Sequence, residues 1–321
     1  MTANRYGLKL MSELHGARAL VRQAEIARDA GFDYVAISDH IHPWLPEHDH
    51  SPFAWSVLGG IAARVPDLPL ATGVTCPIGR YHPVIVAHAA ATVASMSDRP
   101  FTLALGAGER LNEHVTGEPF PAVDLRHERL AEAIEIIREL WDGRWTNVRG
   151  RFFTAEDVRL YDLPREPIRI VVAVSGPASL DLARGVGADG IMATEADPDL
   201  TAGWARRGGN ASSTWTEIPF AWAPTAEEGL DRAHRLFRFG AAGWKVMSEL
   251  PNPVNFDAAC RTVRPEDLAD TIPHGPDPQV FADAVRRSVD AGFTEIAVVP
   301  LCDDVEAFGA FWQRDVRPLL D

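Results

Sequence analysis

An acid, an imidazole and an indole follow one short apolar run near the start of the chain. The run spans 34–37, and Asp39, His40 and Trp44 come soon after it. An uninterrupted apolar run of this length is typical of an interior parallel strand, whose carboxyl end would then carry these side chains. In a parallel barrel, catalytic groups gather at that end. His40 is therefore a candidate general base, because an ordinary imidazole titrates near neutral pH.

Each of these three residues also has a structural interpretation. His40 could be hydrogen-bonded within its own loop, Asp39 could cap the next turn, and Trp44 could pack against its neighbours. The residues alone leave these alternatives open. Three more histidines lie in the same loop, at positions 42, 48 and 50. Their spacing matches no defined zinc or iron motif, so we expect no metal site.

Two further loops carry groups suited to a ligand. Gly106, Gly108 and Glu109 follow the apolar run 101–105. Glycines let backbone approach a flat ligand, and an acid at a strand end can donate a proton. The glycines do not form a dinucleotide fingerprint, because the third glycine is missing. The second loop, 174–177, opens a helix whose first N–H groups could hold a phosphate, although an ordinary strand-to-helix turn would look the same.

The elements that must position these loops alternate along the chain. Helical patterns are predicted at 17–30, 55–64, 84–96, 126–141, 178–187, 226–239, 278–292 and 305–320. Strands are predicted at 5–10, 34–37, 68–72, 101–105, 168–172, 190–193, 218–222 and 295–299. Strand-helix alternation implies a parallel sheet, and eight strands fit a closed barrel. We predict an α/β fold with a single (β/α)8 TIM barrel over 1–321, interrupted by a hairpin excursion at about 145–163 and an insertion at about 240–275.

Composition excludes several classes of protein. The chain has 31 Lys and Arg against 45 Asp and Glu, a net charge of −14, which disfavours a nucleic-acid partner. No apolar run approaches the roughly 20 residues of a membrane span, and no charged leader with a long apolar core begins the chain. Three cysteines give neither a disulfide framework nor a zinc pattern. We therefore expect a cytoplasmic protein with a small-molecule substrate.

In these loops the sequence resembles the luciferase-like flavin and deazaflavin oxidoreductases. Within that family it is most similar to the coenzyme F420-dependent dehydrogenases typified by glucose-6-phosphate dehydrogenase. The resemblance covers nearly the whole chain and is strongest over 1–190. It rests on Ser38-Asp39-His40 with Pro43-Trp44, Arg80-Tyr81-His82-Pro83, Gly106-Ala107-Gly108-Glu109 with Leu111-Asn112-Glu113, and Ser175-Gly176-Pro177.

The resemblance implies hydride transfer to or from a deazaflavin whose ring lies across the barrel mouth. It implies that His40 is the base that takes a hydroxyl proton and that Glu109 is the acid serving the cofactor, with Trp44 and Glu13 on the substrate side. It also implies a cofactor-binding set: Asp39, Gly73, Val74, Cys76, Ala107, Gly108, Asn112, Val174, Ser175 and Gly176. Relatives often have a non-prolyl cis peptide after the third strand, here Gly73–Val74. Cys76 stands where they usually have a hydroxyl residue.

The later loops differ from those of the sugar-phosphate enzymes, in which basic residues clamp the phosphate. Here the segment 193–197 contains Glu195 and Asp197, and the segment 267–274 contains no clear cation. These acids would repel a phosphate. We therefore expect a neutral alcohol or carbonyl substrate.

The second half of the chain is similar to another subgroup, thought to have reverted to an ordinary flavin. The similar segments are 221–225, 250–253 and 263–267. FMN is therefore the alternative cofactor, and an FMN-dependent luciferase-like monooxygenase is the alternative activity. A non-catalytic flavin-binding barrel is a second alternative, which the presence of His40 and Glu109 disfavours. Relatives are commonly dimers, so a homodimer is a possible assembly.

Overall fold

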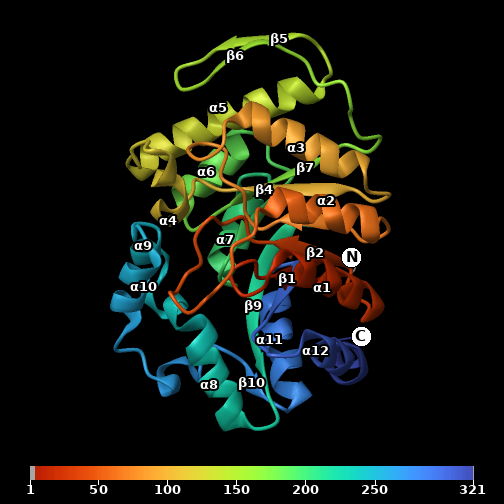
Figure 1. The fold of residues 1–321 in the computed structure, drawn as a ribbon, viewed down its shortest axis with the longest axis vertical. Coiled ribbons are helices and arrows are strands. Elements are labelled where there is room, and N and C mark those ends of the chain that lie inside the picture. The colour runs from red at the N-terminus through yellow and green to blue at the C-terminus, as the bar shows by residue number, and fades with distance from the viewer. Residues whose placement is uncertain (1–3, 321) are drawn as a thin grey trace.

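Eight parallel strands close into a barrel in the computed structural model, which describes residues 4–320 (Figure 1). They pair in the order β9, β11, β1, β2, β3, β4, β7, β8, and β8 pairs back with β9. The predicted TIM barrel is confirmed. Its strands are β1 (Arg5–Leu10), β2 (Tyr34–Ile37), β3 (Leu70–Thr72), β4 (Phe101–Leu105), β7 (Arg169–Ala173), β8 (Gly190–Ala193), β9 (Thr214–Trp222) and β11 (Glu295–Pro300).

Helices surround the barrel wherever the strand-helix alternation predicts them. They are α1 (Ala17–Asp29), α2 (Ala54–Arg64), α3 (Pro83–Ser95), α5 (Val123–Trp141), α6 (Pro177–Gly185), α8 (Ala226–Phe237), α11 (Pro278–Asp290) and α12 (Val305–Phe311). A further helix, α7 (Pro198–Arg206), was missed by the sequence analysis. Asp197 caps it by accepting a hydrogen bond from the N–H of Asp199 at 2.8 Å, and Pro198 occupies its first turn.

Two excursions leave the regular alternation, and both were predicted. The first is the antiparallel hairpin of β5 (Thr146–Arg149) and β6 (Thr154–Val158), which stands beyond α5 at the top of Figure 1. The second contains α9 (Trp244–Met247) and α10 (Pro253–Cys260), and it ends in β10 (His274–Gly275), which pairs with β9. The short helix α4 (Arg110–Glu113) follows β4.

The barrel bore is filled mainly by alternating side chains of its strands. The apolar part of this filling is Tyr34, Ala36, Ala71, Ala104, Val171, Met192, Trp215 and Ala297. A larger apolar layer lies between the strands and the surrounding helices. A separate apolar cluster packs the excursion around α10 against the barrel end and includes Leu111, Phe239 and Phe256.

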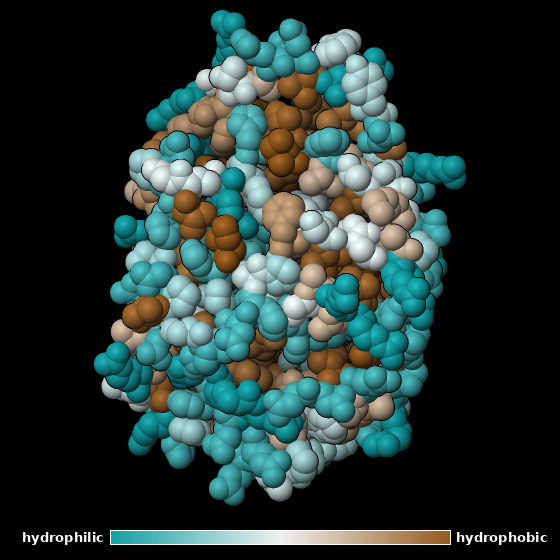
Figure 2. Space-filling model, in the orientation of Figure 1, coloured by the Kyte–Doolittle hydropathy of each residue, from teal (hydrophilic) through white to brown (hydrophobic). Residues whose placement is uncertain are grey.

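The outer surface is mostly hydrophilic, with scattered hydrophobic patches on the face that Figure 2 shows. Among residues 4–320, every helix is too short or too polar to cross a bilayer.

Candidate active site

The predicted site residues gather at the carboxyl end of the barrel. Glu13 follows β1, His40 follows β2, and Glu109 lies between β4 and α4. These three strands are close in the sheet order, and parallel strands present their carboxyl ends at one edge. The sequence therefore brings an imidazole and two carboxylates to one place.

His40 is nearly enclosed between those two carboxylates. Its Nδ1 atom lies 3.1 Å from Glu13 Oε1, although without the angle of a hydrogen bond, and its Nε2 atom lies 3.6 Å from Glu109 Oε1. The His40 side chain is 10% exposed, whereas that of Glu13 is 1% exposed. Trp44 packs edge-on against the imidazole, with ring centroids 4.6 Å apart. The imidazole is thus held between two acidic side chains and an indole, where it could act as a general base.

Glu13 is held in turn by the end of β2. Ser38 Oγ donates to Glu13 Oε2 at 2.7 Å, and the N–H of Ser12 donates to Ser38 Oγ at 3.1 Å. All three side chains are buried. The two serines therefore fix the carboxylate that lies beside His40.

Asp39 accepts hydrogen bonds from three neighbouring side chains. Its Oδ1 atom accepts from Arg80 Nη2 at 3.1 Å and from the Tyr81 hydroxyl at 2.9 Å, and its Oδ2 atom accepts from Thr75 Oγ1 at 2.7 Å. Arg80 Nη2 also donates to the Asp39 carbonyl at 2.7 Å. The cofactor-binding role of Asp39 stays a prediction. The structure shows in addition that Asp39 holds the Arg80, Tyr81 and Thr75 side chains, which the capping interpretation did not predict.

Asn112 connects the two loops that carry His40 and Glu109. Its Nδ2 atom donates to Glu109 Oε1 at 2.5 Å, while its Oδ1 atom accepts from the N–H groups of Ile41 at 2.8 Å and His42 at 3.1 Å. Asn112 is fully buried. It therefore positions the acid and the base relative to each other.

Glu113 is a buried carboxyl group that the sequence analysis did not single out as a site residue. Burial, followed by the nearby charge of Glu109, raises its pKa to about 7. The N–H of Arg80 donates to its Oε2 atom at 2.9 Å. Burial also raises the pKa of the Cys76 thiol, and the Glu113 charge raises it further. The Leu111-Asn112-Glu113 motif was the available signal in the sequence.

The glycine loop after β4 packs closely against this acid. Gly108 has a φ of +76°, and a Cβ atom built there would lie 2.7 Å from Cys76 Sγ. Glycine is therefore required at 108 for both conformation and space. Its neighbour Ala107 is partly buried on the same loop.

The loop after β3 contains the cis peptide that the resemblance implied, between Gly73 and Val74. Beneath it, Lys9 Nζ donates to the Gly73 carbonyl at 2.5 Å and pairs with Glu217 Oε2 at 2.7 Å. Sequence reasoning missed both charged residues, because they lie within the predicted β1 and just before the predicted start of β9.

The loop after β7 has its first N–H groups already engaged. The N–H groups of Ser175 and Gly176 donate to Ser179 Oγ at 3.0 and 3.2 Å, and Val174 is buried beside them. A phosphate bound here would compete with that hydroxyl for both donors. The predicted cofactor contacts of this loop therefore remain expectations.

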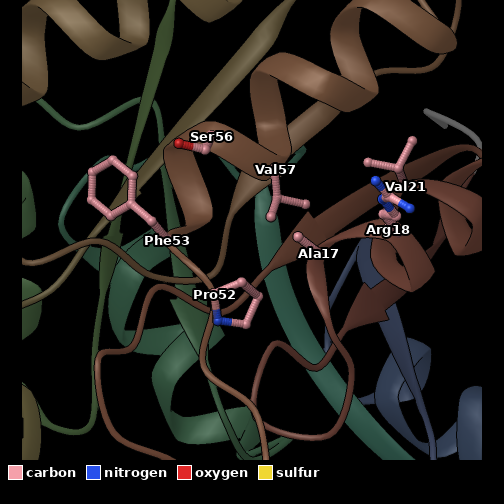
Figure 3. A pocket seen from close by; sticks show the side chains of 7 residues that line it. All are labelled: Ala17, Arg18, Val21, Pro52, Phe53, Ser56 and Val57. Carbon is pink, nitrogen blue, oxygen red and sulfur yellow. The ribbon is translucent and has the colours of Figure 1, made fainter.

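Two cavities lie beside the barrel mouth, and neither is lined by His40 or Glu109. One, of about 320 Å³, is an apolar hollow in which α1 meets the start of α2, next to Pro52 and Phe53 (Figure 3). The other, of about 310 Å³, is lined by polar residues that include His15, His48 and His50. Within the described part of the chain, no group of three or more His, Cys, Asp or Glu side chains is arranged to hold a metal ion.

Comparisons with known proteins show which proteins this chain resembles. The model of the luciferase-like monooxygenase family matches residues 1–295. The F420-dependent hydroxymycolic acid dehydrogenase of Mycobacterium tuberculosis is 36% identical over 98% of this chain and 88% of its own. The F420-dependent glucose-6-phosphate dehydrogenase of Tsukamurella paurometabola is 31% identical over 98% of this chain and 97% of its own.

A solved structure agrees with the fold. An F420-dependent secondary alcohol dehydrogenase, in complex with an F420-acetone adduct, superimposes with a TM-score of 0.91 at 24% identity. The alignment covers 100% of each chain. The likeness extends over the barrel and both excursions.

Proposed function

Because the chain belongs to the luciferase-like monooxygenase family, we propose that it is a coenzyme F420-dependent oxidoreductase. It transfers hydride between the deazaflavin and a neutral alcohol or carbonyl substrate. The observation that carries this proposal is the His40 ring between the Glu13 and Glu109 carboxylates. Similarity to F420-dependent dehydrogenases over nearly the full chain supports the cofactor assignment.

His40 takes the hydroxyl proton of the alcohol at Nε2, the atom that faces away from Glu13. Glu13, beside Nδ1, favours the protonated ring while the alcohol is oxidised. Glu109, held by the Asn112 amide, provides a proton on the cofactor side. When bound, the deazaflavin supplies a two-electron hydride acceptor or donor.

We expect the flat ring to lie against the loops at the barrel mouth. The small residues Gly73, Ala107 and Gly108 would let their backbone approach it closely. The residues that would hold the cofactor are Asp39, Gly73, Val74, Cys76, Ala107, Gly108, Asn112, Val174, Ser175 and Gly176.

We expect the substrate to meet an apolar wall, and the loop after β8 carries two acids. The Trp44 ring stacks on Phe239 with centroids 4.9 Å apart, and the Phe256 ring meets it edge-on at 5.2 Å. After β8, Glu195 and Asp197 are exposed carboxylates. These acids would repel an anionic substrate that approached the loop after β8, whereas a neutral alcohol could bury its apolar groups against the rings.

A titration of the purified protein with F420 and with FMN, followed by cofactor fluorescence, tests this proposal. We expect micromolar or tighter binding of F420 and much weaker binding of FMN. Reduction of bound F420 by members of an alcohol panel would then identify the substrate. Preference for FMN would instead support the flavin-dependent monooxygenase, and binding of neither cofactor would contradict the proposed mechanism.

A further inference from the structure

An ion pair between a buried lysine and a half-buried glutamate spans the barrel bore. Lys9 on β1 and Glu217 on β9 are joined by the contact of 2.7 Å between Nζ and Oε2. Their side chains are 8% and 19% exposed. Because β11 lies between β1 and β9 in the sheet, the pair connects strands that are not neighbours.

The same ammonium also reaches the opposite side of β1. It donates to the Gly73 carbonyl after β3, and β2 lies between β1 and β3. Lys9 therefore links β9 with the loop that follows β3, and each of these strands is two places away from β1 in the sheet. The surrounding bore is lined by small or apolar side chains such as Ala36 and Ala104. Burying a charge among them is costly unless it is paired and hydrogen-bonded.

The Gly73 carbonyl belongs to the segment 73–75 below the expected cofactor ring. Backbone groups hold the rest of this segment, because the N–H of Gly73 donates to the Ile37 carbonyl at 2.8 Å and that of Thr75 to the Ala104 carbonyl at 2.9 Å. Val74 packs against the next loop so closely that a Cβ atom at Gly106 would lie 2.8 Å from it. The Gly73 carbonyl instead receives its hydrogen bond from the Lys9 side chain.

We propose that Lys9 is a positioning residue for the cofactor. Its ammonium holds the Gly73 carbonyl inside the bore. The backbone of Gly73 and Val74 is thereby fixed in place as a support under the deazaflavin ring. Glu217 keeps the ammonium in that position. This inference rests on the proposed function, since the backbone support at Gly73 and Val74 serves the same cofactor.

Replacing Lys9 by Met removes the donor to Gly73 and keeps most of the side-chain volume. We expect the dissociation constant for F420, measured by fluorescence titration, to rise about tenfold, as the loss of one charge-assisted hydrogen bond predicts. Glu217→Gln removes the charge of the partner but leaves the donor to Gly73. Its dissociation constant should rise by less than about threefold.

The opposite end of β1 offers a matched control. Arg5 lies on the same strand as Lys9 but at its amino end, far from the mouth. It forms an ion pair with Glu295 at 3.2 Å. Arg5→Met should lower the temperature of unfolding and leave the F420 dissociation constant within about twofold. A tenfold change in this control would show that loss of any ion pair of β1 weakens binding, and would overturn the inference.

The double variant Lys9→Met with Glu217→Leu separates positioning from stability. Lys9→Met alone leaves Glu217 without its partner and should lower the unfolding temperature. Apolar replacement of both members of a buried ion pair is often neutral for folding, so the double variant should unfold near the temperature of the wild type. Its affinity for F420 should nevertheless stay about tenfold weaker, because Gly73 still lacks its donor. If the double variant bound F420 as tightly as the wild type, the inference about Lys9 would be wrong but the proposed function would stand. If the wild-type protein bound no F420, both the proposed function and this inference would be wrong.

Discussion

The two ends of the barrel bury polar groups in different ways. At the amino end, Arg5 pairs with Glu295, and the hydroxyls of Thr214 and Thr294 lie 3.3 Å apart. At the carboxyl end, four carboxyl groups converge with one guanidinium and one imidazole, namely Glu13, Asp39, Glu109, Glu113, Arg80 and His40. The amino end matches its charges locally, whereas the carboxyl end concentrates acids. An excess of buried acids is typical of a site whose groups exchange protons.

The same strands run through both ends, so the difference lies in the residues rather than in the backbone. On β1, Arg5 is 30% exposed and paired, while Lys9 is buried and reaches a loop carbonyl. On β2, Tyr34 fills the bore, and just after β2, Ser38 donates a hydrogen bond to the Glu13 carboxylate of the mouth. The amino end thus closes the barrel, and the carboxyl end positions side chains for chemistry.

The largest expected effect comes from removing the imidazole at the mouth. His40→Ala should lower kcat for F420 reduction by about a hundredfold to ten-thousandfold, the usual contribution of a general base. Binding of F420 should change only a few fold, because the expected cofactor loops do not include His40. Steady-state assays with an alcohol that the wild type oxidises, together with the fluorescence titration, measure both quantities. Turnover close to that of the wild type would contradict the role of His40.

Much of the fold could be predicted because the strands and helices carry strong apolar patterns. The strands 5–10, 34–37, 101–105 and 190–193 have the bounds that the sequence predicts. The first half of β9 was missed, since Thr214, Thr216 and Glu217 interrupt its apolar pattern. Glu217 lies on the same face as Trp215, in the bore, where it pairs with Lys9, whereas the Thr214 hydroxyl donates to the Gly292 carbonyl at the amino end. No local pattern reveals either contact.

The convergence of the candidate site residues could be predicted, but their supporting contacts could not. His40 and Glu109 were identified from strand ends and loop motifs, and the structure brings them within 3.6 Å of each other. The hydrogen bonds from Arg80 to Asp39 and from Lys9 to Gly73 join residues far apart in sequence. A single sequence contains no signal for such pairs, because only closure of the barrel brings them together.

Glu113 provides a smaller test at the same end of the barrel. Its pKa of about 7, raised from 4.5 by burial, means that the folded protein retains this proton to higher pH than the unfolded chain. This stabilising contribution is present below pH 4.5 and is lost as the pH rises through 7. Glu113→Gln should therefore have little effect at pH 4.5 and increase the free energy of unfolding by about 3 kcal/mol at pH 8.

Urea unfolding of both proteins at several pH values measures this difference. Glu135→Gln is a suitable control, because Glu135 is exposed on α5 and its replacement should leave the pH dependence unchanged. The prediction is wrong if the Glu113 variant loses stability in parallel with the wild type between pH 5 and 8.

The smallest expected effect comes from the amino end. The Tyr34 hydroxyl is buried, and no hydrogen-bond partner for it is found among residues 4–320. Tyr34→Phe keeps the ring contacts with Trp215 at 4.8 Å and Arg5 at 5.4 Å, and it removes a polar group whose burial is unfavourable. We expect the free energy of unfolding to stay equal or to rise by up to about 1 kcal/mol, with kcat unchanged. Urea unfolding and the same alcohol assay measure both. A clear loss of turnover would extend the functional region through the whole bore and remove the distinction between the two ends.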